Sequence, residues 1–169
     1  MREMRALVGM LPWVIVLAIA GAAIWLLLDR QVVLGTWVLA GLIVAHGLVH
    51  ALYLVPPPDA PADQPPGRAA PRWPFDLERS WLVALAGARR GRRLAVILLG
   101  AVVGFSALAA LATIGVLPVV WWSALVVLAA GASLVLLVLA FDIQLILGVG
   151  IDVVLLVVAL TGAWTPASG

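Results

Sequence analysis

Three ionisable residues stand inside long apolar stretches of this sequence, where their side chains could do chemistry. His46 and His50 lie four residues apart, and Asp152 lies within the last apolar stretch. Imidazole titrates near neutral pH, so a histidine can accept and release protons or bind a metal ion. A carboxyl group among apolar side chains needs a hydrogen-bonding partner or must keep its proton. These three side chains are the first candidates for a functional site.

The composition excludes several other kinds of chemistry. The chain has 169 residues, with no cysteine and with arginine at all ten basic positions. The lack of cysteine excludes disulfide bonds, iron–sulfur clusters and thiol nucleophiles, and the lack of lysine excludes a Schiff base. The net charge of +2 is too small to indicate a nucleic-acid partner. Hydrophobic residues make up 65% and charged residues 11%, against about 25% charged in soluble domains. Most of the chain must therefore face lipid.

Five stretches are long and apolar enough to cross a bilayer, which takes about 20 apolar residues in a helix. They run approximately over residues 7–28, 34–54, 94–117, 119–141 and 143–163. We interpret the first as a retained helix, because its apolar run exceeds the roughly 7–15 residues of a secretory signal core. The expected fold is all-α: a polytopic membrane protein with a five-transmembrane-helix bundle. Residues 1–54 hold the first two helices and residues 94–163 the other three.

The loop of residues 55–93 divides into two parts. Residues 56–74 contain eight prolines, which predict an extended chain. Residues 76–90 predict a short amphipathic helix that lies in the membrane interface or packs on other protein. A basic cluster at its end either anchors the next span or binds an anionic lipid or an acidic partner. The basic cluster comprises Arg89, Arg90, Arg92 and Arg93.

The placement of arginine predicts the orientation in the membrane. Arginines gather before the first span and in the 55–93 loop, whereas the opposite side carries only Arg30. We therefore expect the N-terminus and the loop in the cytoplasm and the C-terminus outside. The expected location is the plasma (inner) membrane.

Two polar stripes can be counted along the second and fifth predicted spans. The stripes comprise His46, His50 and Tyr53 on one helix, and Gln144, Gly148 and Asp152 on the other. At about 1.5 Å per residue, His46 and Asp152 lie roughly 12 and 14 Å from the cytoplasmic end. We expect the stripes to face each other as a polar track to mid-membrane, with Gly148 opposite His50. Ser133, in the fourth span, falls at the depth of His46.

Four interpretations of this cluster remain open. The first is that hydrogen bonds among these side chains hold the helices together and do nothing else. The second is a proton or ion relay. His46 or His50 could bind a metal ion or a tetrapyrrole, although the pair lacks the glutamate of zinc-protease motifs. Acid–base catalysis with Asp152 is the fourth interpretation, and no nucleophile motif or phosphate loop supports it.

The functional expectation is a non-catalytic integral membrane subunit, an accessory protein of a larger membrane complex. The alternative is a small transporter of protons, ions or solutes that uses His46, His50 and Asp152. A metal- or tetrapyrrole-binding membrane protein is the third possibility, and no cofactor is required by the sequence. The expected partners are the lipid bilayer and other membrane subunits, and no enzymatic activity is expected.

Overall fold

The computed structural model describes residues 32–55, 74–140, 142 and 145–166, and these contain helices and no strands. The long helices are α2 (Val32–Val49), α4 (Ala88–Thr113), α5 (Trp122–Leu139) and α6 (Ile146–Thr161). Short helices are α3 (Trp81–Ala86) and the 3-10 segments His50–Leu54, Leu77–Arg79 and Val119–Trp121. The first expected span, residues 7–28, and the proline-rich residues 56–73 lie outside the described part.

Three of these segments are long and apolar enough to cross a membrane: Gly35–Leu54, Ala88–Thr113 and Val119–Leu139. They agree with the second, third and fourth expected spans, although α4 begins earlier and also includes the basic cluster. The fifth expected span corresponds to α6, an apolar helix of 16 residues. The described part is therefore an all-helical membrane protein.

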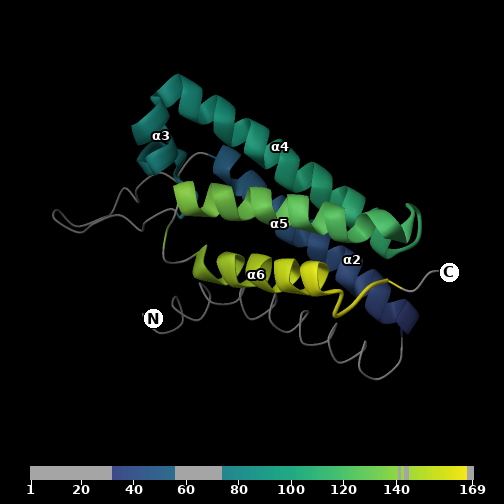
Figure 1. Cartoon of the computed structure of the whole chain (residues 1–169). Coiled ribbons are helices and arrows are strands. Elements are labelled where there is room, and N and C mark those ends of the chain that lie inside the picture. Colours follow the sequence, from purple (N-terminus) through teal and green to yellow (C-terminus); the bar gives the residue numbers. More distant parts are fainter. Residues whose placement is uncertain (1–31, 56–73, 141, 143–144, 167–169) are drawn as a thin grey trace, which may run out of the picture.

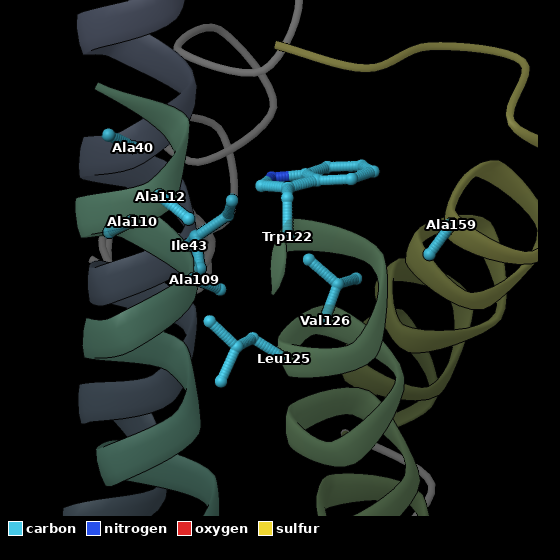
Figure 2. Close-up of a cluster of buried hydrophobic side chains, with 9 residues drawn as sticks. All are labelled: Ala40, Ile43, Ala109, Ala110, Ala112, Trp122, Leu125, Val126 and Ala159. Carbon is cyan, nitrogen blue, oxygen red and sulfur yellow. The ribbon is translucent and has the colours of Figure 1, made fainter. Parts of the chain in front are cut away.

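The long helices form a bundle in which α4 packs against both α2 and α5, and α5 also packs against α6 (Figure 1). One buried core surrounds Trp122 of α5, which is only 1% exposed (Figure 2). Alanines of α4 belong to the same core, and the indole Nε1 of Trp122 donates a hydrogen bond to Thr113 Oγ1 at 2.9 Å. A second core contains Tyr53, Phe75 and Leu136, at the other end of the helices.

A close approach fixes α2 against α4 next to the histidines. A Cβ atom added at Gly47 would lie 2.7 Å from both Cβ and Oγ of Ser106 on α4. Real Cβ atoms do not tolerate that distance, so only glycine allows the two helices to meet here. Gly47 lies between His46 and His50, and the contact therefore sets how far both imidazoles reach into the bundle.

The amphipathic helix expected over residues 76–90 is divided in the structure. Ser80 ends the 3-10 turn and caps α3, because its hydroxyl accepts a hydrogen bond from the Val83 amide. Gly87 ends α3 with φ at +77°, a backbone conformation that favours glycine. Arg89 and Arg90 therefore belong to the first turn of α4 rather than to the loop helix.

Candidate functional site

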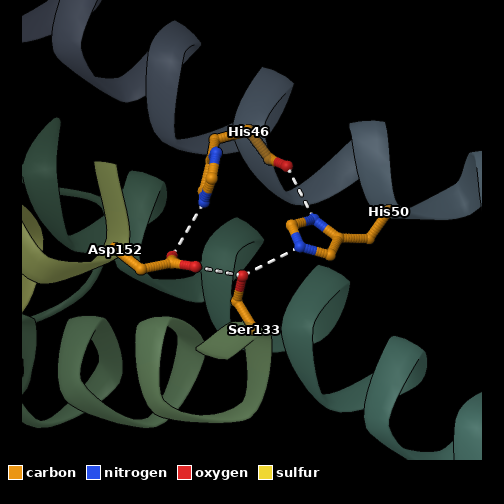
Figure 3. Close-up of polar contacts among 4 residues, drawn as sticks. All are labelled: His46, His50, Ser133 and Asp152. Carbon is orange, nitrogen blue, oxygen red and sulfur yellow. Dashed lines mark hydrogen bonds and ion pairs between the residues drawn. The ribbon is translucent and has the colours of Figure 1, made fainter. Parts of the chain in front are cut away.

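Four side chains from three helices are joined by hydrogen bonds in the middle of the bundle (Figure 3). His46 Nε2 lies 2.8 Å from Asp152 Oδ1, and Ser133 Oγ lies 2.5 Å from Asp152 Oδ2. The same serine oxygen lies 2.8 Å from His50 Nε2. His50 Nδ1 is 3.0 Å from the backbone oxygen of His46. We call His46, His50, Ser133 and Asp152 the polar cluster.

The polar cluster is almost fully enclosed by protein. Asp152 has no exposed surface, and Ser133 and His50 are exposed by 1% and 2%. The side chain of His46 retains 12% of its exposure. Polar groups buried this deeply are destabilising unless they form hydrogen bonds, which explains why every member of the cluster has a partner.

The end of α2 positions the two histidines. His50 follows the last residue of α2, where the chain changes from α-helix to 3-10 helix. Carbonyl groups in the last turn of an α-helix lack an amide partner within the helix. The His50 ring donates from Nδ1 to one of these carbonyls, that of His46. This bond holds the imidazole across the helix end and directs Nε2 toward Ser133.

Tyr53 and Gly148 lie near the cluster but do not belong to its hydrogen bonds. Tyr53 is buried; its hydroxyl donates to the Ala140 carbonyl at 3.4 Å and its ring packs edge-on against Phe75. Gly148 does not face His50 as expected: a Cβ atom there would meet the Leu137 side chain of α5 at 3.3 Å. Gln144 lies outside the described residues, so its expected place in the track is not described.

Ser133 joins His50 to the Asp152 carboxyl group, a role that the sequence indicated only through the predicted depth of Ser133 in the membrane. It lies on α5, between α2 and α6, and its single hydroxyl contacts both His50 and Asp152. A serine within a run of alanine, glycine and leucine normally bonds its own helix backbone. In the sequence, the signal for this role was the predicted depth of Ser133 in the membrane, which matches that of His46.

The number of protons in the cluster follows from the hydrogen bonds. Ser133 has one proton to donate, yet an aspartate carboxylate and the free nitrogen of a neutral imidazole are both acceptors. If Ser133 donates to Asp152, His50 Nε2 must donate to the serine, and the ring carries protons on both nitrogens. If Ser133 donates to His50, the Asp152 carboxyl must carry a proton and donate it to the serine.

Both arrangements satisfy all four hydrogen bonds, with His46 neutral and donating from Nε2 to Asp152. In each arrangement, the cluster holds one proton more than it would with an ionised Asp152 and two neutral histidines. The fully bonded cluster is therefore electrically neutral, as burial in a low-dielectric interior favours. The two arrangements differ only in which of Asp152 and His50 holds the additional proton.

The geometry gives little support for a metal ion held jointly by the histidines. Both ring nitrogens of His50 are engaged in hydrogen bonds, and His46 Nε2 is directed at Asp152. Within the part of the chain that the structure describes, no group of three or more histidine, aspartate or glutamate side chains is arranged to hold a metal. What the site can do chemically is hold and transfer a proton.

Comparison with known proteins does not add to this description. No protein family, curated protein or solved structure matches the chain.

Proposed function

We propose that this protein is a small membrane carrier that takes up and releases a proton at the polar cluster. This is the second of the functions expected from the sequence, the transporter that uses His46, His50 and Asp152. The observation that carries the proposal is the Ser133 hydroxyl, which forms hydrogen bonds with both the Asp152 carboxyl group and the His50 imidazole. The hydroxyl can donate its single proton to only one of these groups, so the other group must donate a proton to the serine. The cluster thus holds one exchangeable proton inside the bundle.

Proton transfer within the cluster needs no movement of heavy atoms. The additional proton passes from Asp152 to His50 when one proton moves from the carboxyl to the serine and another from the serine to the imidazole. These steps follow hydrogen bonds of 2.5 and 2.8 Å. Ser133 therefore acts as the relay between the two groups that can store the proton.

His46 provides the exchange of protons with the surroundings. Its side chain is the most exposed of the four, and it contacts the carboxyl group directly. When the ionised Asp152 takes up a proton, the incoming proton binds His46 Nδ1 and the ring passes its Nε2 proton to Asp152 Oδ1 along a hydrogen bond of 2.8 Å. A half-turn of the carboxyl group then places this proton on the oxygen next to Ser133. An imidazole suits this step because one ring nitrogen can accept a proton while the other donates one.

The proposal includes the membrane arrangement inferred from the sequence. We place the chain in the plasma (inner) membrane with five spans, the N-terminus and the 55–93 loop in the cytoplasm, and the C-terminus outside. The support is the distribution of arginine, which gathers in the segments assigned to the cytoplasm. Thiol labelling of single cysteines introduced near position 60 and after position 163 would test it, since the chain has no native cysteine.

Proton flux into vesicles is the direct test of the proposed function. The full chain is reconstituted into liposomes containing a pH-sensitive dye, and a potassium diffusion potential drives proton entry. The wild-type protein is expected to acidify the lumen, whereas Asp152→Asn is expected to abolish the protein-dependent flux. Asparagine can accept from His46 and donate to Ser133, so it imitates the protonated carboxyl group but cannot release a proton.

Thr113→Val is the matched control. It removes a different buried hydroxyl, one that bonds Trp122 and the Ala109 carbonyl outside the polar cluster. Its flux should equal that of the wild type. The proposal is wrong if wild-type vesicles acidify no faster than protein-free vesicles, or if Asp152→Asn transports as fast as the wild type.

Membership of a larger membrane complex, the first expectation from the sequence, stays a separate proposal. A proton-exchanging cluster is compatible with a free carrier and with a subunit of an assembly. Gentle purification from the native membrane tests it, because stoichiometric co-purifying subunits are expected only for an assembly.

A further inference from the structure

The short helix α3 is fixed against the first turns of α4. Leu82 is buried, and a Cβ atom added at Gly91 would lie 2.9 Å from the Cα atom of Val83. The two backbones are therefore in direct contact at a position where only glycine fits. Figure 1 shows α3 beside the start of α4. The outward side of α3 is thus a defined surface of the fold.

Two large apolar side chains project from this outward side. Trp81 is 67% exposed and Leu85 is 81% exposed, and residues four apart share one face of a helix. On α4, Ile97 is 66% exposed and follows Arg93 by one turn on the same side. The surface therefore changes from charged to apolar within about one helical turn, as expected where headgroups meet hydrocarbon.

The arginines near this surface differ in whether they have carboxylate partners. Glu78 Oε1 lies 2.7 Å from Nε of Arg92 and 2.5 Å from its Nη2. Arg79 Nε lies 3.2 Å from Asp76 Oδ2. Within the described residues, three exposed arginines of the first turns of α4 have no carboxylate partner: Arg89, Arg90 and Arg93. These three fall within about 100° of one another around the helix axis.

We propose that the first turns of α4 form a binding site for the headgroup of an anionic phospholipid. The lipid-binding surface consists of Arg89, Arg90, Arg93 and Ile97, which share one side of α4. Gly91, which contacts α3, lies on the other side of this helix. The three unpaired guanidinium groups bind the headgroup phosphate, for which their planar donor geometry is suited. Ile97, one turn beyond Arg93 on the same side, lies against the acyl chains of the bound lipid.

Lipid rather than a soluble anion is the occupant that the surroundings favour. The arginines open the segment Ala88–Thr113, which is long and apolar enough to span a membrane, so the headgroup layer lies next to them. A free phosphate would bind the guanidinium groups alone and leave the exposed Ile97 without an apolar partner. Each arginine close to an anionic surface increases binding by about fivefold.

Native mass spectrometry of the full chain tests the proposal. The protein is equilibrated in detergent micelles with equal amounts of phosphatidylglycerol and phosphatidylcholine, and the lipids that remain bound are counted. We expect wild-type protein to retain phosphatidylglycerol preferentially and to lose the preference as the salt concentration rises. The variant Arg89→Gln/Arg90→Gln/Arg93→Gln should reduce the preference by up to about a hundredfold, from the same fivefold contribution per arginine.

Two single substitutions separate direct binding from a general effect of charge. Arg90→Gln and Arg92→Gln each remove one positive charge, but Arg92 is already bound to Glu78. Arg90→Gln should therefore lower the phosphatidylglycerol preference more than Arg92→Gln. Glu78→Gln should raise it, because it frees Arg92 to bind phosphate.

Several outcomes would overturn the proposal. Equal retention of the two lipids by wild-type protein would exclude the site, and this measurement needs no variant to fold. A lower preference in Glu78→Gln would show that the ion pair is required for structure only. Displacement of the lipid by millimolar inorganic phosphate would identify a soluble-anion site instead.

Discussion

Replacing Asp152 separately by alanine and by asparagine tests whether Asp152 carries the additional proton of the polar cluster. Alanine removes the carboxyl group that lies 2.8 Å from His46 Nε2 and 2.5 Å from Ser133 Oγ. Interhelical hydrogen bonds in membranes contribute about 0.6–1.7 kcal/mol each, and buried groups left unpaired cost about 1–3 kcal/mol. We therefore expect Asp152→Ala to lower the free energy of unfolding by about 2–4 kcal/mol.

Asparagine should be tolerated far better, because it has the hydrogen-bonding pattern of the protonated acid. Its carbonyl oxygen accepts from His46, and its amide donates to Ser133, which then donates to His50. The second amide hydrogen finds no acceptor in a site with no exposed surface, which costs about 1 kcal/mol. Asp152→Asn should therefore lower the free energy of unfolding by only about 1 kcal/mol.

Reversible unfolding of both variants in mixed micelles, followed by tryptophan fluorescence, provides the measurement. A cluster held only as an aspartate–imidazolium pair would behave differently, because asparagine would leave a buried positive charge unpaired. Loss of one partner of a buried ion pair costs about 3–5 kcal/mol. If Asp152→Asn is as unstable as Asp152→Ala, the arrangement in which Asp152 carries the additional proton is refuted.

Two further predictions concern glycines at helix contacts. Gly47→Ala should destabilise the protein by about 1–3 kcal/mol and reduce proton flux, because its Cβ would lie 2.7 Å from Ser106. Gly104→Ala is its control: that position has no atom within 4 Å, so alanine should stabilise α4 by up to about 1 kcal/mol. Equal unfolding free energies for the two would contradict the close approach. Gly91→Ala should detach α3 from α4 and increase the thiol reactivity of a reporter cysteine at the buried position Leu82. An unchanged labelling rate would show that α3 does not depend on this contact.

Counting residues from a common membrane boundary placed the important side chains at matching depths. His46 and Asp152 were counted to nearly equal depth, and the structure has them 2.8 Å apart. Depth does not determine the direction in which a residue points around its helix axis. For that reason Gly148, expected opposite His50, instead packs against Leu137 of α5. The tightest contact of α2, between Gly47 and Ser106, has no signature in a chain with sixteen glycines.

The ends of helices were less predictable than the apolar spans. Hydropathy placed the start of the third span at Leu94, but α4 begins at Ala88 and includes the basic cluster. Arginine ends an apolar run without ending a helix, because it is a good helix former. Gly87 and Ser80 mark the actual boundaries, through a positive φ and a capping hydroxyl. Both residues are visible in the sequence, but they lie within residues 76–90, which we expected to form a single helix.

The attachment of α6 has a consequence for how a carrier of this design would change conformation. Of its 16 residues, only Asp152 and Ala159 are buried. By contrast, α4 and α5 interlock through many buried side chains. Besides its apolar packing on α5, the shortest of the long helices is therefore held by a reactive group, and gaining or losing one hydrogen ion there would alter its attachment to the rest of the bundle. In a pump or exchanger built this way, α6 is the moving part and the α4–α5 pair is the frame.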